Sequence, residues 1–285
     1  MQARERRTGA WCEPQGSKQR TLLASLLVRA GEVLSADRLI HELWGDAPPA
    51  GAANALQAHV ARLRRRLRGP GDGGPERIST HATGYVLHLG SATTDAQHFL
   101  RLSARGRAAA DADPAHAAEV LRRALELWRG PALEGCGRGP LCGREADRLE
   151  EVRLDTLEAF HEAGLRAPGG AAHRARIAAE LERLTAEHPL RERFYDLLMT
   201  ALHGCGRRTE ALGVYERARR HLLAELGVEP GPALRGRLET VLHRPEDLGG
   251  EVARLRERVE TLSRAQEELT RRIVRLTRAA GARAD

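Results

Sequence analysis

Between Asp95 and Leu242 the chain consists of one helix-forming segment after another, and this stretch restricts the possible folds more than any other feature. Residues 190–226 show it most clearly, because small and apolar side chains fall where two helices of a TPR-like hairpin pack together. These positions are Leu198, Ala201, Leu202, Gly206, Ala211, Leu212, Tyr215 and Ala218. Residues 117–128 have a similar spacing, preceded by an N-cap and a first-turn proline at Asp113-Pro114. The sequence therefore predicts an all-α, TPR-like domain over residues 95–243, a type of fold that provides interaction surfaces.

The region before this domain combines helical and strand signals. Serine, glycine and proline mark the ends of three helical segments. The signals are Ser17 and Gly31 around the first helix (18–30), Ser35 and Gly45 around the second, and a turn at 46–49 before the third (51–67). Two β-rich segments, Arg77–Thr80 and Tyr85–Leu89, then flank a short turn. Three helices followed by a hairpin predict a winged helix-turn-helix over residues 17–90. A generic α+β domain without a nucleic-acid role is the alternative.

Positive charge is concentrated in this winged-helix region. The formal net charge of the chain is +7. Residues 1–90 contain 13 Arg and Lys against 8 Asp and Glu, whereas residues 91–245 contain 24 against 23. Between Ala47 and Gly71 there are five Arg and no acidic residue. A localised excess of this kind indicates a polyanionic partner.

The third helix has two distinct faces. At 100° per residue, four residues fall within one narrow arc and are predicted to face the core: Leu56, Val60, Leu63 and Leu67. The opposite face carries Asn54, Ala58, Ala61, Arg62 and Arg65, and the flanks carry Gln57, His59, Arg64, Arg66 and Arg68. Alanine allows close approach to base edges, Arg can pair with guanine and Asn or Gln with adenine, and flanking Arg suit phosphates. The pattern predicts a helix that binds in a DNA groove; a solvated Arg-rich face is the alternative.

Several segments, in the same order along the chain, resemble one known family. The winged-helix region resembles the Streptomyces antibiotic regulatory proteins in Lys18-Gln-Arg-Thr-Leu-Leu, Leu43-Trp-Gly-Asp-Ala-Pro-Pro and Thr83-Gly-Tyr-Val-Leu. The helical region is similar to the bacterial transcriptional activator domain of that family in Leu125-Glu-Leu-Trp-Arg-Gly-Pro and Leu226-Gly-Val-Glu-Pro-Gly-Pro. The resemblance covers residues 17–243 and includes the third helix.

This resemblance implies a winged helix of the response-regulator type and a sequence-specific transcriptional activator of a secondary-metabolite (antibiotic) gene cluster. Members of the family bind direct repeats near promoters and recruit RNA polymerase, so double-stranded DNA and RNA polymerase are the expected partners. Carried over residue by residue, the resemblance assigns to the groove helix Asn54, Gln57, Arg62, Arg65 and Arg66. It assigns phosphate contacts to Lys18, Arg20 and Trp44, and the tip of the wing to His81 and Thr83.

Both ends of the chain depart from the family pattern. Members usually begin with a small β-sheet before the Lys18-Gln-Arg motif, but residues 1–16 are polar and have no strand pattern, so we expect them to supply no sheet. Either the natural chain starts further upstream or the domain lacks part of its scaffold. Residues 248–278 carry a heptad pattern with Leu at d positions and Val252, Val259, Gln266 and Ile273 at a positions. We expect a C-terminal coiled-coil helix that makes the protein a homodimer; a single helix folded back on the helical domain is the alternative.

The sequence has no pattern typical of catalysis or cofactor binding. Its four cysteines match no zinc or disulfide spacing, its twelve histidines are scattered, and the glycines of residues 135–139 follow no strand. We therefore expect no enzyme activity, no cofactor and no metal. Because no apolar run approaches the length of a membrane span, we expect a cytoplasmic protein without a membrane partner. The functional alternative to the activator is a TPR-like interaction scaffold with a degenerate DNA-binding domain.

Overall fold

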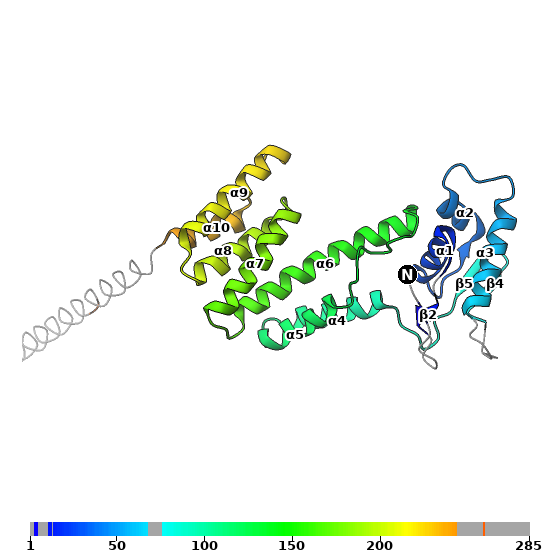
Figure 1. Cartoon of the computed structure of the whole chain (residues 1–285), viewed down its shortest axis with the longest axis horizontal. Coiled ribbons are helices and arrows are strands. Elements are labelled where there is room, and N and C mark those ends of the chain that lie inside the picture. Colours follow the sequence, from blue (N-terminus) through cyan, green and yellow to red (C-terminus); the bar gives the residue numbers. More distant parts are fainter. Residues whose placement is uncertain (1–2, 5–10, 13, 68–75, 244–258, 260–285) are drawn as a thin grey trace, which may run out of the picture. The chain divides into compact units, whose positions relative to one another are not determined.

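The computed structural model describes residues 3–4, 11–12, 14–67, 76–243 and 259 of the chain (Figure 1). The chain divides into two compact units, Met1–Gly169 and Gly170–Asp285. Within the described ranges, no helix is long and apolar enough to cross a membrane. The fold is mainly helical, and all the strands among the described residues are short and belong to the first unit.

The first unit contains a domain of three helices and a three-stranded sheet. Its elements are α1 (Ser17–Val28), β3 (Leu34–Ser35), α2 (Ala36–Trp44), α3 (Ala52–Leu67), β4 (Ile78–His81) and β5 (Gly84–Leu87). The sheet is antiparallel in the order β3-β5-β4, so that Tyr85 on the central strand lies opposite both Leu34 and Thr80. Ala82 and Thr83 form the connection between β4 and β5. This arrangement confirms the predicted winged helix-turn-helix.

Local signals place most of the helix ends where the sequence predicts them. The Ser35 side chain accepts the backbone N–H of Arg38 at 3.3 Å and caps α2, and Gly45 ends that helix with a φ of 66°. The expectation that Ser17 caps α1 is wrong, because Gly16 occupies the N-cap position and Ser17 is already helical. Gly16 has a φ of 82°, a conformation that favours glycine, and the chain therefore enters the helix one residue earlier.

The first sixteen residues contain more structure than their sequence predicts. Strand β1 (Ala3–Arg4) pairs antiparallel with β2 (Trp11–Cys12). The expectation that this segment supplies no sheet is therefore wrong. Strands of two residues are joined by backbone hydrogen bonds and are too short to show the alternation by which strands are recognised in a sequence.

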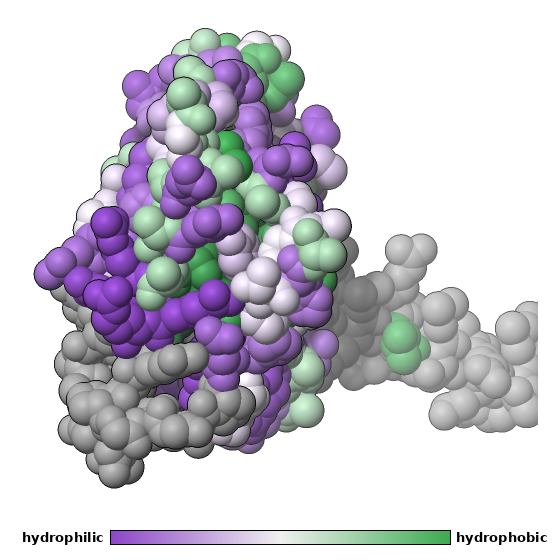
Figure 2. Space-filling model, turned by 90° about the vertical axis from the view of Figure 1, so that its right-hand side faces the viewer, coloured by the Kyte–Doolittle hydropathy of each residue, from purple (hydrophilic) through white to green (hydrophobic). Residues whose placement is uncertain are grey.

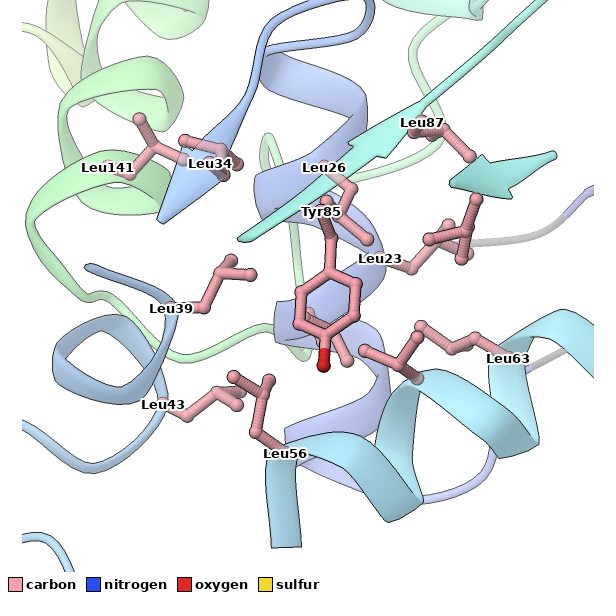
Figure 3. Packing of buried hydrophobic residues seen from close by; sticks show 13 residues of the cluster. Leu23, Leu26, Leu34, Leu39, Leu43, Leu56, Leu63, Tyr85, Leu87 and Leu141 are labelled. Carbon is pink, nitrogen blue, oxygen red and sulfur yellow. The ribbon is translucent and has the colours of Figure 1, made fainter. Parts of the chain in front are cut away.

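A core of apolar side chains, most of them leucines, joins α1, α2, α3 and the sheet (Figure 3). Leu56, Leu63 and Ile78 are at most 1% exposed, and Tyr85 lies among them with 8% of its surface exposed. Aromatic residues make up only 3% of the chain, which explains why leucine dominates. One member of this core, Leu141, comes from a segment far outside the winged-helix sequence.

Three further helices complete the first unit. They are α4 (Asp95–Ala109), α5 (Pro114–Leu125) and α6 (Pro140–Arg166). The predicted cap before α5 is confirmed, because the Asp113 carboxylate accepts the N–H of His116 at 3.0 Å and Pro114 occupies the first turn. Phe99 of α4 packs edge-on against Trp128, with ring centroids 5.2 Å apart. The 27-residue helix α6 packs against α4 and α5 and also reaches α1 and α2 (Figure 1).

The second unit, described by itself, consists of packed helices over residues 171–242. They are α7 (Ala171–Glu187), α8 (Glu192–Gly204), α9 (Arg208–Leu226) and α10 (Pro232–Leu242). Six of the eight residues predicted to pack in the hairpin of α8 and α9 are at most 7% exposed: Leu198, Ala201, Leu202, Ala211, Tyr215 and Ala218. Leu212 is half-buried, and Gly206 is exposed in the turn between the two helices. Asp196, which is 3% exposed, accepts hydrogen bonds from Arg193 and Arg237 and so ties α8 to α10.

The predicted boundaries and the compact units divide the chain differently. The sequence places a boundary near residues 90–95, inside the first compact unit. The reason is that α6 packs against helices on both sides of that boundary. The predicted coiled coil over residues 248–278 lies outside the described residues, except for Val259.

Candidate nucleic-acid interface

The inner face of α3 fixes the position of this helix on the domain. Leu56, Val60 and Leu63 are each 1% exposed and pack with leucines of α1 and α2. Leu67, at the end of the helix, is half-buried and packs against the same core. The predicted core-facing residues are thereby confirmed, and burial of this apolar face holds the helix along its whole length.

The outer face of α3 is exposed. Its exposed residues are Asn54, Gln57, Ala58, Ala61, Arg62 and Arg65. In the view of Figure 2, strongly hydrophilic residues gather beside a narrower apolar area on the side of the winged helix that faces the viewer. Guanidinium and amide groups on such a face offer the paired donors and acceptors that match base edges, and the two alanines leave room for close approach. No acidic residue occurs anywhere in α3.

Arg64 does not belong to this exposed face. Its Nε donates to the Ile78 carbonyl at 2.9 Å, and its Nη2 donates to the Thr80 hydroxyl at 2.7 Å. The same guanidinium pairs with Glu76 at 2.9 Å and lies 6.0 Å from the centre of the Tyr85 ring. Arg64 therefore joins α3 to the β4–β5 hairpin and fixes the position of the hairpin relative to the helix.

Lys18 and Trp44 meet beside α3. The Lys18 ammonium donates to the Leu43 carbonyl and lies 5.7 Å from the centre of the Trp44 ring. The ring centroids of Trp44 and His59 are 6.3 Å apart. Burial, together with the positive charges of Arg62 and Lys18, lowers the pKa of His59, so this imidazole is neutral at pH 7. The Lys18–Trp44–His59 cluster thus brings together the start of α1, the end of α2 and the middle of α3.

Besides Lys18 and Arg64, two more of the predicted contact residues are engaged within the chain. The Arg20 Nε donates to the Gly135 carbonyl at 2.9 Å, in the connection between α5 and α6. Arg66, in the last turn of α3, is half-buried and also has an interaction within the chain. For Arg20 no sequence signal could have shown this contact, because 115 residues separate the two partners.

The turn of the hairpin is exposed. His81 and Thr83 both lie on the surface at this turn, as expected for the tip of a wing. The Thr83 carbonyl accepts the Ala36 N–H at 3.0 Å, which ties the turn to the start of α2. A side chain at Gly84 would overlap the Leu34 carbonyl, so only glycine allows β5 to approach β3 at this point.

Sequence reasoning missed a charged residue that the structure buries. Glu42 of α2 is 6% exposed, and its carboxylate contacts the start of α6. The one signal for it is its position, since Glu42 follows Leu39 by three residues and precedes Leu43, within the apolar stripe of α2.

Both regions of the chain match models of known protein families. Residues 94–242 match the bacterial transcriptional activator domain, and residues 14–87 match the family described as transcriptional regulatory protein, C terminal. These two matches together cover the winged helix and every helix from α4 to α10.

Individual relatives span the same two regions. The chain is 42% identical over 232 residues to the transcriptional regulator RedD of Streptomyces coelicolor, covering 80% of this chain and 65% of RedD. It is 37% identical over 232 residues to the regulatory protein DnrI of Streptomyces peucetius, covering 79% of this chain and 84% of DnrI. Among solved structures it is similar to Mycobacterium tuberculosis EmbR in complex with a low-affinity phosphopeptide, with a TM-score of 0.74 and 33% identity. That similarity covers 82% of this chain and 61% of the EmbR chain.

Proposed function

Because the chain belongs to the Streptomyces antibiotic regulatory protein family of transcriptional regulators, we propose that it activates transcription by placing α3 in the major groove of double-stranded DNA. The observation that carries this proposal is the exposed, acid-free outer face of α3 on a helix held by a buried inner face. The major groove admits an α-helix, and a rigid helix presents its side chains to base edges in a fixed register.

The proposal divides the contact residues by their surroundings. Arg62 and Arg65, with Asn54 and Gln57, contact base edges, because all four are exposed on the outer face. Lys18 and Trp44, with Arg66, bind phosphates beside the groove, and His81 and Thr83 at the wing reach the adjacent groove. Arg20 and Arg64 are assigned to the scaffold instead, because both are only partly exposed and donate to backbone carbonyls of other segments. Lys18 also donates to a carbonyl, that of Leu43, but it is exposed.

The wider role of the protein is proposed from its family. We assign DNA binding to residues 17–90 and contact with RNA polymerase to the helical region at residues 95–243. The target is a promoter with direct repeats in a secondary-metabolite gene cluster, and the heptad pattern of residues 248–278 makes the protein a homodimer in the cytoplasm. Similarity to RedD and DnrI, both named as regulators from Streptomyces, supports this assignment.

A mobility-shift assay with the full chain tests the proposal. The specific duplex is a promoter fragment from the biosynthetic genes that neighbour its own gene, and a random duplex of equal length measures non-specific binding. Arg62→Ala and Arg65→Ala should each weaken specific binding by roughly 1–3 kcal/mol, about 5- to 150-fold, and weaken non-specific binding much less. Arg123→Ala, which removes an exposed arginine from α5, is the matched control and should change neither.

Two outcomes would count against these assignments. Equal losses on both duplexes would make Arg62 and Arg65 phosphate contacts. Absence of binding by the unmodified chain to every promoter fragment would favour the interaction scaffold. Affinity should also fall steeply as salt rises, because cationic side chains release counterions from the DNA, and a flat dependence would contradict electrostatic binding.

A further inference from the structure

The connection between α5 and α6 lies against the winged helix. Residues 135–142, which span the end of this connection and the start of α6, belong to the sequence region that matches the activator domain, yet Leu141 is part of the winged-helix core. Its side chain is 7% exposed and lies near Leu34 and Leu39 (Figure 3). The apolar core of the DNA-binding domain is therefore completed by a residue more than fifty positions beyond its last strand.

A buried carboxylate fixes this contact. Glu42 Oε2 accepts the backbone N–H of Leu141 at 2.8 Å, and Oε1 accepts that of Cys142 at 2.8 Å. These are the first N–H groups of α6, since the helix begins with Pro140, and Gly139 at the N-cap has no side chain to bind them. Glu42 thus supplies from α2 the cap that α6 lacks, and the positive end of a 27-residue helix offsets the cost of burying its charge.

Gly139 is matched to this carboxylate by size. A Cβ at position 139 would lie 2.5 Å from the Glu42 Cδ and 2.6 Å from Oε1. The backbone there has a φ of −66° and a ψ of 175°, which any residue adopts. Glycine at position 139 therefore leaves the space that the Glu42 carboxylate occupies in its bonded position, whereas the backbone conformation does not call for glycine.

Side chains of α1 add to the same interface. The Thr21 hydroxyl accepts the Gly137 N–H at 2.6 Å, and Arg20 donates to the Gly135 carbonyl at 2.9 Å. The Cys142 thiol lies 3.5 Å from the Ser25 hydroxyl, and burial raises its pKa to about 12, so this thiol stays protonated. The backbone of residues 135–142 is bonded to two helices of the winged helix at several successive points.

We propose that residues 135–142 are an integral part of the DNA-binding domain and that Glu42 is the positioning residue that couples α2 to the activator region. The winged helix and helices α4–α6 therefore depend on each other for their stability. Loosening the start of α6 loosens α1 and α2 and so displaces the support of α3. The domain that binds DNA extends physically into the sequence that the family models assign to the activator domain.

Amide hydrogen exchange on the full chain, without DNA, tests this coupling independently of the proposed DNA binding. Glu42→Ala should speed exchange of the Leu141 and Cys142 amides on the order of 100-fold, because two buried N–H groups lose a charged acceptor. Amides of α1 and α2 should speed up in parallel, whereas α8 and α9 in the second unit should not change. Asp46→Asn, which alters a 99% exposed carboxylate just after α2, is the control and should change none of them.

A double-mutant cycle identifies the contact itself. In the chain that keeps Glu42, Gly139→Ala should speed exchange of the Leu141 and Cys142 amides about as much as Glu42→Ala does. In the chain that already carries Glu42→Ala, Gly139→Ala should add little, because the carboxylate that its Cβ would meet is gone. Glu42→Gln keeps the volume and gives a milder variant if Glu42→Ala does not fold. Additive effects of the two substitutions, or faster exchange at Leu141 and Cys142 with α1 and α2 unchanged, would overturn the proposal.

Discussion

The outer face of α3 and the face formed by α1 and α2 use charged residues in opposite ways. On α3, Arg62 and Arg65 are exposed. On α1 and α2, Arg20 and Glu42 are bonded to backbone groups of residues 135–142. This difference between the two faces shows that a charged residue in the sequence does not by itself identify a binding surface. Arg20 and Glu42 hold distant segments of the fold together, whereas the exposed Arg62 and Arg65 remain available to a ligand.

The largest expected effect comes from the buried contact between the two sequence regions. Leu141→Ala should destabilise the winged helix by about 2–5 kcal/mol, because it removes a nearly buried side chain from the core and leaves a cavity. Chemical denaturation followed by hydrogen exchange in α1–α3 measures it. Leu226→Ala, at a residue that is 55% exposed, should cost less than about 0.5 kcal/mol. Unchanged exchange in α1–α3 would mean that the activator region does not support the winged helix.

Arg64→Ala should lower both the stability of the fold and the affinity for DNA, because Arg64 lies between the exposed face of α3 and the β4–β5 hairpin. Loss of its bonds to Ile78 and Thr80 should destabilise the hairpin by about 1.5–3 kcal/mol and weaken binding to DNA as well. Arg65→Ala, at the neighbouring exposed position, should weaken DNA binding with little change in stability. Thermal melts and mobility shifts on the same four proteins, with Arg64→Lys as the conservative variant, separate the two effects. If Arg64→Ala weakened DNA binding without lowering stability, Arg64 would be a phosphate contact on the flank of α3, as its sequence position predicts.

Arg20 provides a smaller and sharper test, because the family resemblance assigns it to phosphate. Arg20→Ala should cost about 0.5–1.5 kcal/mol of stability through its lost bond to the Gly135 carbonyl. It should leave the slope of log affinity against log salt unchanged, whereas removal of a true phosphate contact reduces that slope by roughly one unit. A reduced slope would show that Arg20 binds phosphate despite its contact within the chain.

The smallest effect concerns pH and His59. Its pKa is lowered by burial and by the charges of Arg62 and Lys18, so the unfolded chain binds this proton more readily than the folded one. This residue's contribution to stability is therefore complete above pH 6.5, its ordinary value, and is lost as the pH falls through the lower folded value. Stability profiles of the wild type and His59→Gln should converge in acid; His81→Gln, at an exposed position, is the control. If the stability of the wild type and that of His59→Gln changed in parallel with pH, the lowered pKa of His59 would be contradicted.

Local patterns were sufficient to predict most of the fold. The 3.6-residue period separates Leu56, Val60 and Leu63 from the exposed Arg62 and Arg65, and the structure has the same division. Ser35 and Asp113 cap their helices as their positions predict. These features depend on residues within one or two helical turns of each other, which is the range over which a single sequence carries information.

The rest depends on partners that are distant in the sequence. Glu42 and Leu141 are 99 residues apart, so the position of Glu42 within the apolar stripe of α2 cannot indicate which group its carboxylate binds. Arg64 lies among similar arginines, and it bonds to the hairpin because β4 passes beside it. The pairing of β1 with β2 involves strands of two residues, which no periodicity can reveal.

The capping of α6 by Glu42 limits how this protein can be recombined. A chimera that joins a foreign winged helix at the linker near residue 90 would place an unmatched side chain against Gly139 and an unmatched core against Leu141. A functional graft should transfer residues 135–142 with the winged helix, or retain Glu42 and its neighbours on α1 and α2. The part that must be transferred together thus consists of two separate stretches of the sequence, although these stretches lie side by side in the folded protein.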